Sequence, residues 1–320
     1  LNAGVLGRST LHLFLDLVYS LSRERVMFLL DSGLYPVGRW AATRAAVPAT
    51  RVALFRHHDV GSLRQRLVRG DLDACRPIVV TDGWCPRCGR PAPLHEYLQQ
   101  VRRFRGRLIV DDTQALGVLG RRDRAGTPYG WGGGGLLPWF GITGSDIAVV
   151  ASLAKGFGVS VAVLAACPEV VEDFKVHGLT WMHCSPPSMA DVRAAEHALA
   201  LNVRMGDARR ERLLECVRHF RRRLNDLELA ARGAVFPVQT VSSPFGLDLY
   251  RLHRRLWDEG VRTVLLREDL QHPMQLGFVI NARHGFNEID RAIALLARYW
   301  QKDSRGNRRV VLSSASHSLP

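Results

Sequence analysis

Short apolar runs that alternate with amphipathic stretches are the feature that most constrains the fold of this chain. Each run is long enough for one strand and is apolar throughout, which is typical of strands buried on both faces of a sheet. The predicted strands cover residues 26–30, 51–55, 77–81, 107–111, 146–152 and 159–166. Helical patterns separate them, for example over residues 61–70 and 94–104. This alternation predicts an α/β domain built on a mainly parallel sheet.

The rest of the chain predicts a smaller domain. Residues 189–226 have apolar positions at helical spacing and many arginines, which predicts one long helix. Three predicted strands and a closing helix follow, over residues 235–250, 261–266, 276–281 and 287–300. We therefore expect a large domain over residues 1–200, a small α+β domain over residues 201–300, and a polar, mobile tail over residues 301–320.

The net charge of +14 raises the question of nucleic-acid binding. Only three of the 44 basic residues are lysines (Lys155, Lys175 and Lys302), and the arginines are scattered along helical surfaces. We therefore expect no nucleic-acid partner. No apolar run is long enough to span a membrane, and no signal peptide follows Leu1. These features predict a cytoplasmic protein without a membrane partner, whose start may lie upstream of Leu1.

Two polar residues lie where a ligand of such a sheet would bind. Asp111 ends a predicted strand, and ligands of open α/β sheets bind beyond the carboxyl ends of the strands; a helix cap is the alternative role. Lys155 follows another strand in the segment ASLAKGFG, whose glycines 156 and 158 let the backbone pass close to a ligand. A lysine held against an apolar strand end has a lowered pKa, which suits Schiff-base chemistry. A surface lysine in a turn is the alternative.

The segments IVDDTQALGVLG (109–120) and DIAVVASLAKGFGVSVAVLAA (146–166) together resemble the α-oxoamine synthases. This family of fold-type I enzymes uses pyridoxal 5'-phosphate (PLP) and includes 8-amino-7-oxononanoate synthases and 5-aminolevulinate synthases. Further matches follow in the family's order: HHDVGSL (57–63), VVTDG (79–83), APL (92–94), SPP (185–187) and GDARRERL (206–213). The resemblance covers residues 7–300. It implies the aspartate-aminotransferase fold, with a large PLP-binding domain and a small C-terminal domain.

The resemblance also implies roles for individual residues. Lys155 would form the internal aldimine and later move protons, and Asp111 would keep the pyridine nitrogen protonated. Ser152 matches a hydroxyl that binds the cofactor phosphate. Tyr35 falls where the family stacks a histidine on the cofactor ring, and an aromatic side chain suits that position.

The phosphate of the cofactor has a second expected contact. The segment Gly7-Arg8-Ser9-Thr10 matches the loop that holds the phosphate at a helix N-terminus. A simple helix cap by Ser9 or Thr10 is the alternative.

The sequence departs from the family pattern in four ways. Gln114 replaces a histidine that contacts the cofactor, which removes a group that titrates near neutral pH. Gly277 stands at the arginine that grips the substrate carboxylate, and Arg283 lies too far along the strand to replace it. His183 replaces a threonine that reaches a phosphate across the dimer interface; phosphate binding and packing both remain open for it. The family's first quarter has no counterpart in this chain.

The pair Cys85 and Cys88, in CPRCG, is one half of a zinc knuckle. Cys75, His57, His58 and His95 are available in the sequence as further ligands, but no second CxxC motif exists. A zinc site and a redox pair are the alternatives to a tight turn above the active site, which we favour. No metal is therefore assigned.

The resemblance implies a homodimeric PLP-dependent acyltransferase. Its substrates would be an amino-acid-like amine and an acyl thioester, carried by CoA or a carrier protein. The alternatives are another PLP reaction on the same scaffold (an aminotransferase or decarboxylase) and a catalytically impaired homologue that acts as a binding partner.

Overall fold

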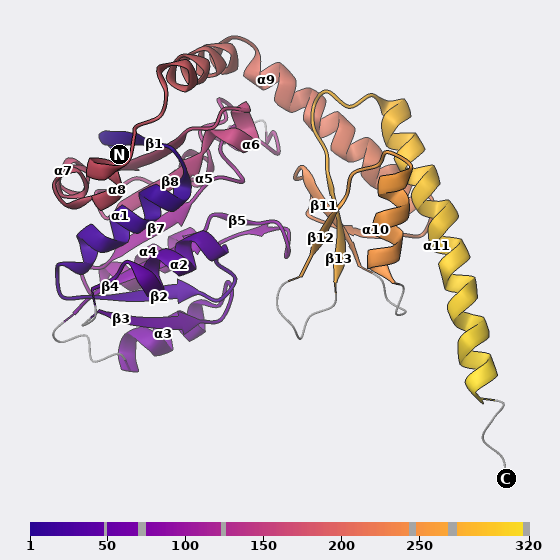
Figure 1. Cartoon of the computed structure of the whole chain (residues 1–320), viewed down its shortest axis with the longest axis horizontal. Helices are drawn as coiled ribbons and strands as arrows, with labels where there is room; N and C mark the ends of the chain where they lie inside the picture. The colour runs from indigo at the N-terminus through magenta and orange to yellow at the C-terminus, as the bar shows by residue number, and fades with distance from the viewer. Residues whose placement is uncertain (48–49, 70–74, 123–125, 243–247, 268–273, 316–320) are drawn as a thin grey trace. The chain divides into compact units, whose positions relative to one another are not determined.

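The apolar runs of the first half of the chain pair into one seven-stranded sheet in the computed structural model (Figure 1). The strand order is β1-β9-β8-β7-β4-β2-β3. The strands are β1 Ala3–Gly7, β2 Val26–Asp31, β3 Arg51–Phe55, β4 Arg76–Asp82, β7 Arg107–Asp111, β8 Ile147–Ser152 and β9 Ala162–Ala166. Strands β3, β2, β4, β7 and β8 are parallel to one another, and β9 is antiparallel to both β8 and β1. The predicted mainly parallel sheet is confirmed, although β9 begins three residues later than expected.

The structure describes residues 1–47, 50–69, 75–122, 126–242, 248–267 and 274–315, with side chains up to residue 300. The chain divides into two compact units. The larger unit holds Leu1–Cys85 and Pro91–Asp207, and the smaller unit holds Ala208–Pro320 together with Pro86–Arg90. Residues Pro86–Arg90 form the tip of a two-stranded hairpin made by β5 (Trp84–Cys85) and β6 (Arg90–Pro91). Within the described residues, no helix is both long and apolar enough to cross a bilayer.

Helices pack on the large sheet and bury its apolar residues. They are α1 Thr10–Ser22, α2 Pro36–Arg44, α3 Val60–Arg69, α4 Leu94–Arg102, α5 Leu136–Phe140, α6 Leu153–Phe157, α7 Pro168–His177 and α8 Leu179–His183, followed by α9 Met189–Asn225. Helix α1 packs against α2, α7 and α8 (Figure 1). Its residues Phe14 and Leu17 are completely buried in the same apolar cluster as Phe28 of β2 and Val150 of β8. This burial, the main favourable term in folding, fixes the strand order that carries the candidate site.

The smaller unit is built on a four-stranded antiparallel sheet of order β10-β11-β13-β12. Its strands are β10 Ala231–Arg232, β11 Val238–Ser242, β12 Val264–Leu266 and β13 Gln275–Val279. Helices α10 (Leu249–Asp258) and α11 (Phe286–Ala315) complete it with the second part of α9. The rings of Phe220 and Phe278 lie 5.1 Å apart, centroid to centroid, in its core.

One sequence prediction for this unit is wrong. The strand expected over residues 235–250 ends at Ser242, residues 243–247 lie outside the described part, and α10 begins at Leu249. The Asp248 carboxylate accepts a hydrogen bond from the Arg251 N–H (3.1 Å) and caps this helix. Helix α11 extends as far as Ala315, into the residues predicted to form the polar tail, and that prediction stays untested.

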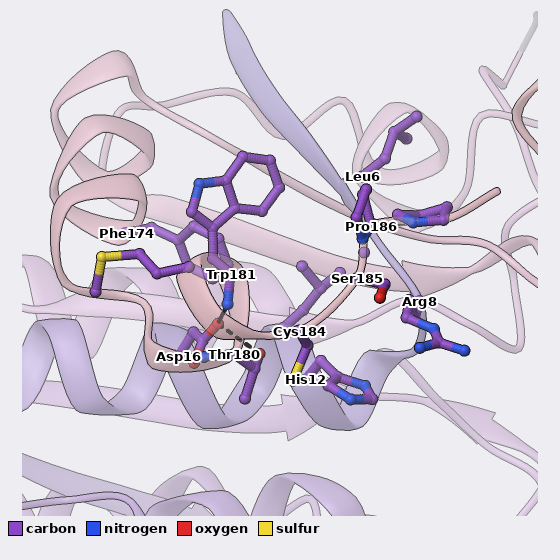
Figure 2. A pocket seen from close by; sticks show the side chains of 14 residues that line it. Leu6, Arg8, His12, Asp16, Phe174, Thr180, Trp181, Cys184, Ser185 and Pro186 are labelled. Carbon is purple, nitrogen blue, oxygen red and sulfur yellow. Dashed lines mark hydrogen bonds between the residues drawn. The ribbon is translucent and has the colours of Figure 1, made fainter. Parts of the chain in front are cut away.

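A buried carboxylate joins two helices that are far apart in the sequence. Asp16 of α1 is only 2 % exposed and lies beneath the start of α8. Its oxygens accept hydrogen bonds from the Thr180 N–H (2.9 Å), the Thr180 hydroxyl (2.6 Å) and the Trp181 N–H (2.7 Å) (Figure 2). The carboxylate thus satisfies backbone donors at a helix N-terminus that have no partner within the helix.

We predict that Asp16→Ala lowers the free energy of unfolding by about 2–3 kcal/mol, because two buried backbone donors lose a charged acceptor. Urea denaturation of the purified chain measures this change. Glu172→Ala, which removes an exposed side chain of α7 paired with Lys175, is the control and should change stability by less than about 0.5 kcal/mol. Equal effects of the two substitutions would contradict the role given to Asp16.

A second buried carboxyl, that of Asp112, supports the loop between β7 and α5. It is 3 % exposed, and its Oδ2 accepts a hydrogen bond from the Leu136 N–H (2.9 Å). Its Oδ1 is buried with no hydrogen-bond partner. Burial and the neighbouring Asp111 charge raise the pKa of Asp112 to about 8. The hydrogen bond from the Leu136 N–H lowers this pKa but is the weaker effect. The folded state therefore holds this proton more tightly than the unfolded state does.

We predict that this proton makes stability depend on pH. The folded pKa lies above the unfolded value of 3.8, so stability is fully present below pH 4 and falls as the pH rises towards 8. The slope is at most about 1.4 kcal/mol per pH unit. Asp112→Asn should remove this slope, whereas Asp226→Asn, at an exposed position, should keep it. Urea unfolding curves between pH 5 and pH 8 test this, and parallel pH profiles for wild type and Asp112→Asn would contradict it.

Candidate active site

Parallel strands end at one edge of the large sheet, and three of them end in a carboxylate. Asp31 ends β2, Asp82 ends β4 and Asp111 ends β7. The register sets Asp82 directly opposite Asp111 on the neighbouring strand. This edge is where ligands of open α/β sheets bind. The candidate site is therefore built from strand ends that the sheet register holds side by side.

Lys155 lies on α6, directly after β8, and faces these carboxylates. Its Nζ lies 5.9 Å from the centroid of the Tyr35 ring. Burial lowers the pKa of Lys155, while the charges of Asp111 and Asp82 raise it, and the net direction is downward. A lysine in this environment has a larger neutral fraction at neutral pH than a surface lysine, and the neutral amine is the nucleophile.

Backbone packing fixes the position of α6. The Ser152 hydroxyl accepts a hydrogen bond from the Ala154 N–H (3.2 Å) and caps the helix. A Cβ atom at Gly156 would lie 2.4 Å from the Leu116 carbonyl oxygen, so glycine is required there by the chain's own backbone. Gly158 has a positive φ of 71° and ends the helix. The chain's own backbone therefore explains both glycines. The close approach of a ligand, which the sequence predicts at these positions, would be an additional reason for them.

Asp111 is held by hydrogen bonds from the turn that follows it. It is 8 % exposed, and its Oδ1 accepts a hydrogen bond from the Thr113 N–H (3.0 Å). The Thr113 hydroxyl in turn accepts one from the Ser152 N–H (3.0 Å), which ties this turn to the end of β8. Burial raises the pKa of Asp111, although the Thr113 hydrogen bonds and the Lys155 charge act in the opposite direction.

Asp82 is a site residue that the sequence analysis did not single out. Both of its oxygens accept the Tyr35 N–H at 3.1 Å, which holds Tyr35 at the start of α2. Tyr35 is 56 % exposed, so its side chain is accessible to a ligand. The sequence did contain a signal for Asp82, because this carboxylate directly follows the strand predicted over residues 77–81. The rule that selected Asp111 would have selected it too.

The remaining predicted residues lie at other points. Gln114 is half-buried in the turn three residues beyond Asp111. Ser9 is the N-cap of α1: its hydroxyl accepts the His12 N–H (3.5 Å) and contacts His12 Nδ1 (2.8 Å), as the helix-cap alternative expected. Thr10 begins α1, and exposed His183 ends α8.

Arg8 lines a pocket of about 360 Å³ at the start of α1 (Figure 2). His12, Trp181 and Pro186 line the same pocket. A guanidinium group beside a helix N-terminus suits a phosphate, which is the group predicted for this loop. The phosphate roles of Arg8, Ser9, Thr10, Ser152 and His183 stay predictions.

The curated relatives of this chain include several 8-amino-7-oxononanoate synthases. No family model matches the sequence. The chain is 29% identical to the 8-amino-7-oxononanoate synthase of Alkalilimnicola ehrlichii over 258 residues, which are 79% of this chain and 62% of the relative. It is 24% identical to that of Thermosipho melanesiensis over 255 residues, 78% of this chain and 61% of the relative. The chain thus spans about three fifths of the length of these curated relatives.

Solved structures show the same fold. A serine palmitoyltransferase of Sphingomonas wittichii superposes with a TM-score of 0.81 and 17% identity, covering 95% of this chain and 73% of that one. An 8-amino-7-oxononanoate synthase from Francisella tularensis superposes with a TM-score of 0.73 and 17% identity, covering 94% and 83%. The sequence relatives and the fold together confirm the resemblance of this chain to the α-oxoamine synthases, with the fold-type I architecture of PLP-dependent enzymes.

Proposed function

We propose that this chain carries the PLP-binding site of an acyltransferase of α-oxoamine synthase type. Such an enzyme joins the acyl group of a thioester to the amine-bearing carbon of an amino-acid-like substrate. One observation carries the proposal: Lys155, with its lowered pKa, faces the buried Asp111 at the carboxyl ends of adjacent strands. The relatives' names support the reaction class.

The donor set at this edge fits PLP. Lys155 supplies an amine for the aldehyde, Asp111 supplies a buried carboxyl for the pyridine nitrogen, and Tyr35 offers an accessible aromatic ring near Lys155. Ser152 and the segment of Arg8, Ser9 and Thr10 are the proposed phosphate contacts. When bound, PLP supplies an electron sink that stabilises negative charge at the substrate carbon.

The chain's own residues would then divide the work. Asp111 would hold a proton at the pyridine nitrogen, where its burial would keep water from competing for that proton. Lys155 is the group placed to take a proton from the substrate carbon, because its neutral form is favoured by burial. Gln114 can donate and accept hydrogen bonds but does not exchange a proton near neutral pH. Proton transfer at this site therefore falls to Lys155.

The substrates and assembly complete the proposal. The acyl donor would be a thioester of CoA or of a carrier protein, and the second substrate a small amine. We further propose a cytoplasmic homodimer, as the resemblance implies and as is common for symmetric oligomers. Gly277 stands in place of the carboxylate-binding arginine and favours either of two alternatives. These are another PLP reaction and an amine substrate without an α-carboxylate.

We predict that PLP attaches covalently to Lys155. The chain is incubated with PLP, reduced with borohydride and digested, and the labelled peptide is identified by mass spectrometry. The label is expected on Lys155, because its amine has the lowered pKa. Lys155→Ala should abolish the label and the visible absorbance of the bound cofactor.

The composition of the chain provides matched controls. Lys175 and Lys302 are the other two lysines, so Lys175→Ala and Lys302→Ala should keep both the label and the absorbance. A label that persists in Lys155→Ala, or wild-type protein that takes up no PLP, would contradict the proposed cofactor site.

We also predict that the PLP-loaded protein, given an amine substrate and an acyl-CoA, releases free CoA thiol. The reason is that condensation breaks the thioester bond while it forms a new carbon–carbon bond. A thiol reagent follows the release, and mass spectrometry identifies the product. Conversion of the amine without thiol release would contradict the acyltransferase and support a transaminase or decarboxylase on the same scaffold.

A further inference from the structure

A pocket in two adjoining parts opens beside the start of α1, within the larger unit. The first part, of about 360 Å³, lies between α1, α7 and α8 (Figure 2). The second part has a volume of about 420 Å³, and both parts are lined by Arg8, Ser185, Pro186 and Pro187. Volumes of this size are common in sites for small molecules. On the basis of the proposed function, we propose that this pocket binds the acyl chain of the thioester substrate, and that this chain is apolar to its end.

The sheet register sets this pocket close to the candidate site. Strand β1 is parallel to β8, because both are antiparallel to β9. Gly7 of β1 and Ser152 of β8 are both paired with Ala162, so these two strand ends lie about 9–10 Å apart at one edge of the sheet. Arg8 directly follows β1, and the second part of the pocket reaches Ser160, between α6 and β9. The pocket therefore opens at the edge that carries α6 and its lysine.

The first part of the pocket is apolar at the end away from Arg8. Figure 2 shows Arg8 on one side of it and Trp181 and Phe174 on the opposite side. Leu13 and Phe174 are almost completely buried in its wall, whereas Trp181 and Met182 are exposed at its rim. Exposed large apolar side chains around a pocket are typical of a surface that a ligand covers. A saturated chain that entered from the Arg8 side would remove this surface from water, which favours binding.

The polar groups of the first part disfavour a charged end on that chain. The Asp16 carboxylate lines this part, and its hydrogen bonds go to Thr180 and Trp181 at the start of α8. A carboxylate at the end of the acyl chain would lie near Asp16 and be repelled by it. The His12 ring is engaged through its Nδ1 by the N-cap hydroxyl of α1 (2.8 Å). Arg8 lines both parts, so its charge lies where they join rather than at the apolar end.

The second part of the pocket suits the uncharged thioester end of the donor. Ser160, Ser185 and Ser188 line it, and hydroxyl groups can donate hydrogen bonds to a thioester carbonyl. Asp191 also lines it, and its Oδ2 accepts the Ser188 hydroxyl (2.7 Å). A phosphate group of CoA would be repelled by the Asp191 carboxylate. The thioester, rather than the phosphates of the donor, therefore belongs in this part.

Calorimetric titration of the full-length chain, incubated with PLP, tests the proposal with three probes. Octanoyl-CoA carries an apolar chain, suberoyl-CoA carries a chain of equal length that ends in a carboxylate, and free CoA carries none. We expect octanoyl-CoA to bind at least about tenfold more tightly than the other two, because only its chain buries apolar surface without burying a charge. Suberoyl-CoA that binds as tightly as octanoyl-CoA would overturn the apolar end, and free CoA that does so would overturn the pocket.

Cys184 provides a matched pair of variants, because it lines the pocket and is exposed. Cys184→Trp should fill the pocket and lower the affinity for octanoyl-CoA to that for free CoA, whereas Cys184→Ser should keep the wild-type preference. Circular dichroism should show the same fold for both variants, since the substitution is at an exposed position. Equal affinity of Cys184→Trp and wild type for octanoyl-CoA would overturn the proposal.

Alkylation of Cys184 by iodoacetamide, followed by mass spectrometry, gives an independent measurement. Octanoyl-CoA at about ten times its Kd should slow this reaction about tenfold. Cys75, which is half-buried and does not line the pocket, should react at an unchanged rate. Slower alkylation of Cys184 at higher protein concentration, without octanoyl-CoA, would show that a second copy of the chain covers the pocket and would overturn the acyl site.

Borohydride labelling of Lys155 separates this proposal from the proposed function. Labelled Lys155 in a chain that shows no preference for octanoyl-CoA would overturn the acyl pocket alone. A preference for octanoyl-CoA in a chain that PLP does not label would support the pocket and overturn the proposed cofactor site.

Discussion

The register between β4 and β7 is the constraint on which the candidate site depends. It places Asp82 opposite Asp111, so two carboxylates share one largely buried edge. Like charges there would repel each other and lose their hydration, so they need a positive partner or a retained proton. Lys155, at the end of the neighbouring strand β8, is that partner, and its own burial lowers its pKa. The protonation of the amine and of the carboxylates therefore depends on two opposed effects, their burial and their mutual charges.

Hydrogen bonds connect the strand ends at the sheet edge that carries the candidate site. The backbone N–H of Tyr35 joins the segment after β2 to Asp82 of β4. The hydroxyl of Thr81 joins the end of β4 back to Asp31 of β2. A shift of either strand would therefore disturb the wall of the proposed PLP site. Rigidity at this edge is a condition for that site, because it requires groups held at fixed separations.

The sequence predicts those parts of this arrangement that depend on local pattern. Asp111 and Lys155 were identified because each follows an apolar run, and the runs themselves became strands of the sheet. The strand order, in contrast, is set by long-range packing of helices such as α1 on the sheet. Nothing local indicates that β4 lies beside β7. For this reason Asp82 was missed.

The wrong strand prediction in the smaller unit has a different cause. Helix α10 has buried leucines at positions 249, 252 and 256, which is helical spacing, but its first residues continue an apolar segment that begins in β11. For this reason the strand predicted over residues 235–250 included the first residues of α10. The cap at Asp248 was the local signal that could have ended the strand, since an aspartate before an apolar periodic run marks a helix start.

One of the departures from the family pattern, Gly277, concerns the substrate rather than the cofactor. Gly277 lies on β13 between Thr240 and Val264, and a Cβ atom there would meet Leu266 Cδ1 at 3.1 Å and the Val264 carbonyl oxygen at 3.2 Å. An arginine at this position would require both neighbours to move, so the small sheet is packed for glycine. Asp111, Lys155 and Tyr35 meanwhile keep a donor set that fits PLP. We infer that the amine substrate is held by other groups than a carboxylate clamp on β13.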